Sequence, residues 1–124
     1  MIIYRIEHSV SGLGPFTHRS GRNSRYQSSL VMKLIDHADP MDFDEFWEWK
    51  KSKGISIETD LLPPQYRFGW STEEKLISFL KKGVKLARYG GKKKFRYVAY
   101  IGEPEVTLPD GQVIFNWEKS KRVI

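Results

Sequence analysis

The chain has 124 residues, a formal net charge of +6 and no cysteine. This length predicts a single domain over 1–124, because two domains of half the size would each lack a proper core. The absence of cysteine excludes disulfides, thiolate catalysis and cysteine-based zinc sites. No apolar run approaches the roughly 18–20 residues that span a bilayer, so we expect no membrane contact. Without disulfides or a secretory leader, we expect a cytoplasmic protein.

The first predicted element is a strand at 1–7, with apolar residues on both of its alternating faces, which is typical of a central strand. Arg5 would then lie near the interior and need a partner, because an unpaired buried charge is costly. Residues 9–28 follow, rich in Gly, Ser and Arg and without periodicity. We interpret them as a long loop that contacts a ligand or partner, the alternative being a segment with no special role.

An acidic helical segment is predicted over 29–54. Its second helix is expected to begin at Asp42, with Glu45 three residues on as in a capping box, and to end at Gly54. Trp49 lies outside the apolar stripe of this helix, so we expect it at the rim or exposed.

A strand–helix–hairpin unit is predicted over 66–124. Tyr66, Phe68 and Trp70 alternate as in a strand, and Ser71-Thr72-Glu73-Glu74 forms a second capping box. Turn residues at 90–92 and 109–111 separate the later strands, expected at 84–89, 95–101 and 112–117. The fold class expected is therefore α+β, a mostly antiparallel sheet packed with two or three short helices.

No set of residues in the sequence has the spacing that is typical of a metal site or a hydrolytic site. His8, His18 and His37 are far apart and lack nearby carboxylates, so no metal site is predicted. Nothing resembles a nucleophile elbow, and GLGP at 12–15 lacks the Gly-Lys-Ser/Thr of a phosphate loop.

Positive charge gathers in two segments, with an acidic stretch between them. Charges separated in this way steer an approaching partner, either a protein or a polyanion, although such side chains can also be simply solvated. A Lys-rich turn beside aromatic residues could contact phosphates and stack bases, but the aromatic residues at 95–101 also share one face, as in a strand packed on a core. The predicted partner-binding residues are Arg19, Arg22, Arg25, Lys92, Lys93, Lys94 and Arg96.

The segments MIIYRIEH, GLGPF, FGWSTEEKLISFL, GVKLARY and DGQVIF, in this order, resemble a family of small bacteriophage proteins. The resemblance covers both ends of the chain and leaves out residues 17–65. It implies a bacteriophage protein in the infected bacterial cell. Together with the small size, the separated charges and the Arg-rich loop, it leads us to expect an accessory protein that binds and modulates a host macromolecule, such as a defence or takeover target.

More distantly, the chain resembles mono-ADP-ribosyltransferases through Arg5, then Ser71 with Thr72, then Gln112. The resemblance implies that Arg5 holds the diphosphate of NAD, that a hydroxyl at the helix cap orients the ribose, and that a late strand carries a catalytic Glu. Gln112 stands in that last place, and a neutral amide stabilises an oxocarbenium ion poorly. Glu103 or Glu105 in the preceding turn is the alternative carboxylate.

Each candidate also has a structural interpretation. Arg5 could pair with a buried acid, Ser71 could be an N-cap, and Gln112 could be a strand-edge residue beside a turn. An NAD site requires Arg5, Ser71 and Gln112 to converge in one cleft. The hypotheses are, in order of preference, a binder of a host protein, an ADP-ribosyltransferase-like NAD protein that is active or degenerate, and a nucleic-acid-binding module.

Overall fold

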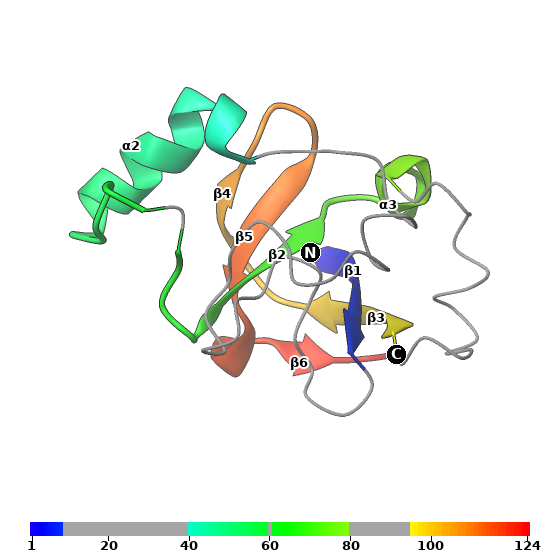
Figure 1. The fold of residues 1–124 in the computed structure, drawn as a ribbon. Helices are drawn as coiled ribbons and strands as arrows, with labels where there is room; N and C mark the ends of the chain where they lie inside the picture. The colour runs from blue at the N-terminus through cyan, green and yellow to red at the C-terminus, as the bar shows by residue number, and fades with distance from the viewer. Residues whose placement is uncertain (9–39, 60, 80–94) are drawn as a thin grey trace.

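The computed structural model describes residues 1–8, 40–59, 61–79 and 95–124 (Figure 1). The first helix of the predicted helical segment, at 29–38, lies outside these ranges, as do the strand predicted at 84–89 and the turn predicted at 90–92. The elements in chain order are β1 (Ile2–His8), η1 (Pro40–Asp42), α2 (Asp44–Ser52), β2 (Tyr66–Trp70), α3 (Glu73–Phe79), β3 (Phe95–Ile101), β4 (Pro104–Thr107), β5 (Gln112–Asn116), η2 (Trp117–Lys119) and β6 (Lys121–Arg122). No helix in the described ranges is long and apolar enough to cross a membrane.

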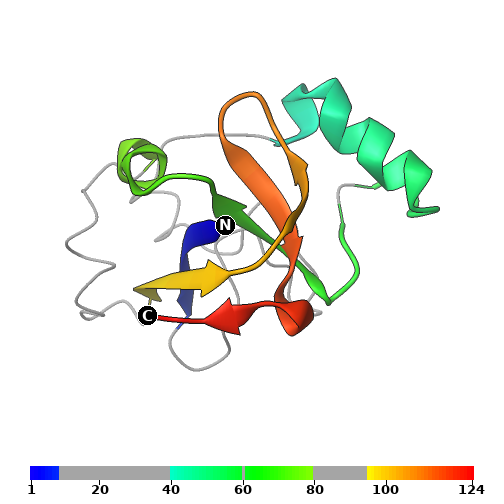
Figure 2. The same ribbon diagram turned by 180° about the vertical axis from the view of Figure 1, so that it is seen from behind.

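The strands form one six-stranded antiparallel sheet in the order β4-β5-β2-β1-β3-β6 (Figures 1 and 2). The strand β1 lies between β2 and β3, which confirms the central position predicted from its two apolar faces. Helix α2 contacts β4, and α3 contacts β2 and β1. The predicted α+β class, with a mostly antiparallel sheet and short helices, is confirmed.

One face of the sheet packs against both described helices, and we call it the helix-covered face. Phe46 and Trp49 of α2 form a core cluster with Ile114 of β5. Phe79 of α3 packs against Trp70 of β2, with ring centroids 5.1 Å apart. Residues directly opposite each other on antiparallel strands have side chains on the same face, so the register determines which residues share this face.

The opposite face is concave. Tyr100 of β3 and Phe115 of β5 have ring centroids 5.4 Å apart, although β2 and β1 lie between their strands. In a flat sheet these two strands would be roughly 14 Å apart, because neighbouring strands are spaced by about 4.8 Å. The sheet is therefore curled, and Ile3, Val98 and Val113 are buried with the two rings inside the curl.

Gly69 of β2 lies against Ile3 of the neighbouring strand β1. A Cβ at this position would overlap Cγ2 of Ile3 and lie 3.2 Å from the carbonyl oxygen of Tyr4. Ile3 is fully buried and stiff at its β-branched carbon, so it cannot swing aside. We expect Gly69→Ala to lower the free energy of unfolding by about 1–3 kcal/mol in urea denaturation.

The overlap with Ile3 provides a control for this prediction. In an Ile3→Ala background the overlapping methyl is absent, so Gly69→Ala should lower the free energy of unfolding by less. An equal loss in both backgrounds would contradict the overlap as its cause.

The ends of the helices correct two sequence predictions. Asp42 does not cap α2, because it lies in the turn η1; Phe43 is the N-cap residue and makes no side-chain cap bond. Trp49 is buried at 6 % exposure rather than at a rim, because Tyr66 packs edge-on against its ring at 5.0 Å. Gly54 follows the helix with a φ of 71°, in agreement with the predicted helix end.

The sheet edges also differ from the sequence prediction. The strands β4 and β6 were not expected, and each occupies an edge of the sheet. The turn predicted at 109–111 is present, with Gly111 at a φ of 95° and the Asp110 side chain accepting from the Gln112 N–H at 3.0 Å. The strand after this turn, β5, ends at Asn116.

Candidate functional site

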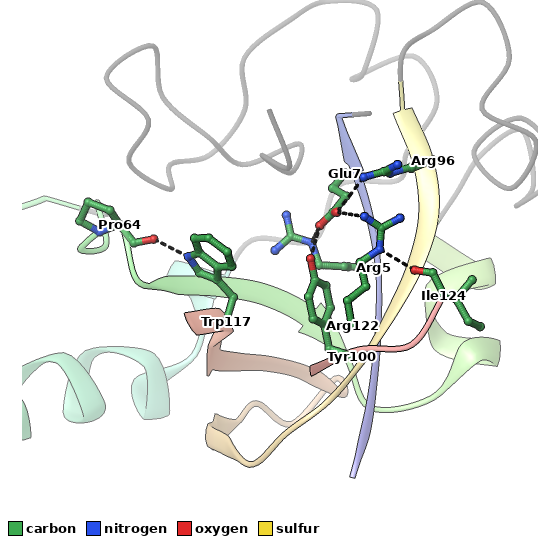
Figure 3. A network of polar contacts seen from close by, with 8 residues as sticks. All are labelled: Arg5, Glu7, Pro64, Arg96, Tyr100, Trp117, Arg122 and Ile124. Atoms are coloured by element: carbon green, nitrogen blue, oxygen red, sulfur yellow. Dashed lines mark hydrogen bonds and ion pairs between the residues drawn. The ribbon is translucent and has the colours of Figure 1, made fainter. Parts of the chain in front are cut away.

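A buried carboxylate on the concave face is surrounded by guanidinium groups and one phenol (Figure 3). Glu7 of β1 is 1 % exposed. The Tyr100 hydroxyl donates to its Oε2 at 2.9 Å, and Nε of Arg5 lies 3.3 Å from the same oxygen. Nη2 of Arg96 and Nη1 of Arg122 lie 3.8 and 3.9 Å from Oε1. Arg67 of β2 also interacts electrostatically with Glu7.

Strand alternation and register bring these residues to one face. Arg5 and Glu7 are two positions apart on β1, so their side chains lie on the same side as that of Ile3. The register pairs Glu7 with Arg96 across β1 and β3, and Tyr100 with Arg122 across β3 and β6. We call Arg5, Arg67, Arg96 and Arg122 the arginine cluster.

Arg5 is the innermost member of the cluster, at 3 % exposure. Burial lowers its pKa to about 10, and the nearby Glu7 carboxylate offsets part of that shift. Its Nε and Nη1 atoms are buried and have no hydrogen-bond partner, so the contact with Glu7 is ionic without a well-directed hydrogen bond. Arg5 therefore lies in the interior with an acidic partner, as its strand position predicts. Its assignment as a ligand-binding residue stays a prediction.

Arg67 and Trp117 were not predicted as site residues. Arg67 is 7 % exposed, and its guanidinium carbon lies 4.4 Å from the centroid of the Trp117 ring. Trp117 is held in place by its indole N–H, which donates to the Pro64 carbonyl at 3.0 Å (Figure 3). Burial lowers the pKa of Arg67, and Glu7 opposes this shift. The available signal was a basic residue inside the aromatic strand at 66–70, the same pattern that singled out Arg5.

The ionisation of the Tyr100 phenol makes the stability of the fold depend on pH. Burial raises the pKa of its phenol, and the negative charge of Glu7 raises it further. Above pH of about 10 the phenol ionises in the unfolded chain while it stays neutral in the folded one. The stabilisation by this phenol is therefore complete below that pH and is lost as pH rises through the folded pKa.

We expect Tyr100→Phe to lower the free energy of unfolding by about 1.5–3 kcal/mol at pH 8, since it removes a hydrogen bond to a carboxylate. The difference from the wild type should shrink as pH rises above about 10. Urea denaturation at pH 8 to 11 measures both effects, with Tyr4→Phe on the helix-covered face as a control for the loss of one phenol. A difference that stays constant up to pH 11 would contradict the raised pKa.

Arg5 and Gln112, both suggested for an NAD site, lie on opposite faces of the sheet. The register aligns Tyr4, Trp70 and Gln112 across β1, β2 and β5, so Gln112 lies on the helix-covered face. Arg5 follows Tyr4 by one position, and its side chain therefore lies on the concave face. The sheet separates Arg5 from Gln112, so this pair does not show the convergence that an NAD site requires.

The remaining candidates for that site have structural roles in the fold. The Ser71 N–H donates to the Gly111 carbonyl at 2.9 Å, and the Thr72 hydroxyl accepts from the Lys75 N–H at 3.2 Å. Thr72 rather than Ser71 therefore caps α3. Gln112 is 1 % exposed, and its amide donates to Asp110 at 2.7 Å, so it is buried rather than at a strand edge. Glu105 forms an ion pair of 2.8 Å with Lys53.

The predicted partner-binding residues are only partly within the described ranges. Arg96 belongs to the arginine cluster, with a side chain that is 33 % exposed. The other six candidates, at 19, 22, 25 and 92–94, lie outside the described residues. Within those ranges no group of three or more His, Asp or Glu side chains is arranged to hold a metal ion.

The comparison with protein families supports the bacteriophage resemblance. A family model described as Bacteriophage T4 Y00F protein matches residues 1–124, including the stretch 17–65 that the sequence motifs left out. No curated protein and no solved structure matches the chain. The distant ADP-ribosyltransferase resemblance receives no support from these comparisons. Because the match spans the whole chain, the protein belongs to the Bacteriophage T4 Y00F protein family.

Proposed function

We propose that this phage protein binds and modulates a host macromolecule in the infected cell, and that the partner is a host protein with an acidic surface. The observation that carries the proposal is the arginine cluster. Arg96 and Arg122 have side chains 33 % and 39 % exposed, so two guanidinium groups at the rim can reach a partner. Guanidinium forks bind carboxylates in a bidentate manner, which suits recognition of Asp and Glu side chains.

A nucleic-acid partner is less well supported by the described residues. Sequence-tolerant binding of single strands needs exposed aromatic rings on which bases stack. Tyr97 and Tyr100 of β3 are each 7 % exposed, and their hydroxyls donate to Glu73 and Glu7. Their rings therefore belong to the packing of the protein, and they offer no stacking surface.

An NAD-binding function is also less well supported. It needs a guanidinium, a hydroxyl and a catalytic group around one ligand. Arg5 lies on the concave face, whereas Gln112 lies on the helix-covered face beside Asp110. A diphosphate could still contact Arg5, but the proposed catalytic position would lie across the sheet.

A pull-down from lysate of the bacterial host tests the proposal. The bait is the tagged full chain, as wild type, as Arg96→Gln/Arg122→Gln, and as Lys51→Gln/Lys75→Gln, which removes two positive charges from exposed positions outside the cluster. We expect the wild type and the lysine variant to retain the same stoichiometric protein after nuclease treatment, and the arginine variant to lose it. Absence of a stoichiometric protein, or equal retention by both double variants, contradicts the proposal. Bound material that disappears with nuclease indicates a nucleic-acid partner instead.

A further inference from the structure

We propose that the concave face holds a binding site for a phosphoryl oxyanion, with Arg5 as its innermost ligand and Arg96 and Arg122 at its rim. The ligand is a small molecule, either inorganic phosphate or pyrophosphate, or the phosphate group of a nucleotide. The inference does not depend on a host protein partner.

Unused hydrogen-bond donors are the first support. Nε and Nη1 of Arg5 and Nε of Arg96 are buried and have no hydrogen-bond partner. Buried N–H groups in proteins are nearly always paired, and those of a charged guanidinium are the most costly to leave unpaired. An oxyanion among these side chains would supply the missing acceptors.

The charge of the site is the second support. Within the described ranges, the arginine cluster contributes four guanidinium groups. Glu7 acts on all four, Glu118 also acts on Arg67, and Nε of Arg122 donates to the Ile124 oxygen at 2.7 Å (Figure 3). Glu7 is shared among Arg5, Arg96 and Arg122. Its contacts with Arg96 and Arg122, at 3.8 and 3.9 Å, are longer than hydrogen bonds. The site therefore favours an additional anion.

The arrangement of the donors favours a phosphoryl group over a second carboxylate. The arginines come from four strands: β1, β2, β3 and β6. Of the three proposed ligands, Arg5 contacts Oε2 of Glu7, whereas Arg96 and Arg122 contact Oε1, so the donors surround the carboxylate rather than forming one fork. A tetrahedral phosphoryl group carries at least three acceptor oxygens and up to two negative charges, whereas a carboxylate offers two oxygens in one plane. The exposed parts of Arg96 and Arg122 give such a ligand a route from solvent.

Calorimetric titration at constant ionic strength tests the site, with phosphate, pyrophosphate, ADP and adenosine as probes and sulfate and chloride as comparison anions. We expect saturable binding of phosphate or pyrophosphate, and none of adenosine. Arg5→Lys keeps the charge but loses the fork, and should weaken binding about tenfold or more. Arg96→Gln should also weaken it, whereas Lys51→Gln should not. ADP that binds more tightly than pyrophosphate identifies a nucleotide source, and the reverse order identifies a free phosphate.

Glu7→Gln provides the sharpest test, because it removes the resident carboxylate and leaves the guanidinium groups in place. We expect phosphate to bind this variant about tenfold more tightly or better, and to raise its unfolding temperature more than that of the wild type. The proposal is overturned if no phosphate probe binds either protein, if chloride acts as strongly as phosphate, or if Arg5→Lys, Arg96→Gln and Lys51→Gln bind equally well. The titrations use purified protein alone, so their failure is distinct from a failure to capture a host protein.

Discussion

Replacing Phe46 with alanine is expected to lower the free energy of unfolding by about 3–5 kcal/mol. Phe46 is 1 % exposed and belongs to the cluster that joins α2 to the helix-covered face of the sheet. Its ring packs edge-on against Trp47 at 4.9 Å and stacks on Phe68 of β2 at 6.3 Å. The ammonium of Lys50 lies 5.5 Å from the same ring, so truncation also removes a cation–π contact from a buried lysine.

Urea denaturation of Phe46→Ala and Phe43→Ala measures this effect. Phe43 is the neighbouring aromatic residue at the start of α2, and it is only partly buried. The loss at Phe43 should therefore be clearly smaller, because less apolar area leaves a well-packed environment. Equal losses for the two variants would mean that Phe46 does not hold α2 on the sheet in the way the packing indicates.

The strands with strong apolar alternation were predictable from the sequence, and the edge strands were not. The strands β1, β2, β3 and β5 each combine β-branched or aromatic residues with a period of two, and all four were predicted close to their observed bounds. The strand β4 has only four residues, with Pro104 at its start, and β6 has two. Such short edge strands exist because a neighbouring strand offers hydrogen-bonding groups, and no local pattern encodes that neighbour.

The candidate site was predictable only in part. The alternation of 1–7 was sufficient to place Arg5 near the interior and to require a partner. It could not identify Glu7 as that partner, because several acidic residues were available and the choice depends on side-chain direction. The contributions of Arg67 and Arg122 depend on strand order and on the curl of the sheet, which are long-range properties. Gln112 and Arg5 lie on opposite faces of the sheet because an offset of one residue moves a side chain to the other face.

Glu7→Gln is expected to lower the free energy of unfolding by about 3–5 kcal/mol in phosphate-free buffer, the usual effect of breaking a buried ion pair by removing one partner. The loss should exceed that of Arg5→Met. Glu7 contacts three arginines and accepts a hydrogen bond from Tyr100, whereas Arg5 is one of several cations near that carboxylate. Without Arg5, Glu7 keeps Arg96, Arg122 and Tyr100; without the charge of Glu7, the buried guanidinium of Arg5 has lost its acidic partner.

The double variant Arg5→Met/Glu7→Gln distinguishes this explanation from a general loss of packing. If the unpaired charge of Arg5 causes most of the instability of Glu7→Gln, replacing Arg5 by an apolar side chain of similar length should recover a large part of it. Urea denaturation of the wild type, both single variants and the double variant gives the coupling free energy directly. Strictly additive losses would show that Glu7 stabilises the fold independently of Arg5. A double variant that is more stable than additivity predicts, by about 1 kcal/mol or more, would show that Arg5 and Glu7 stabilise the fold as a pair.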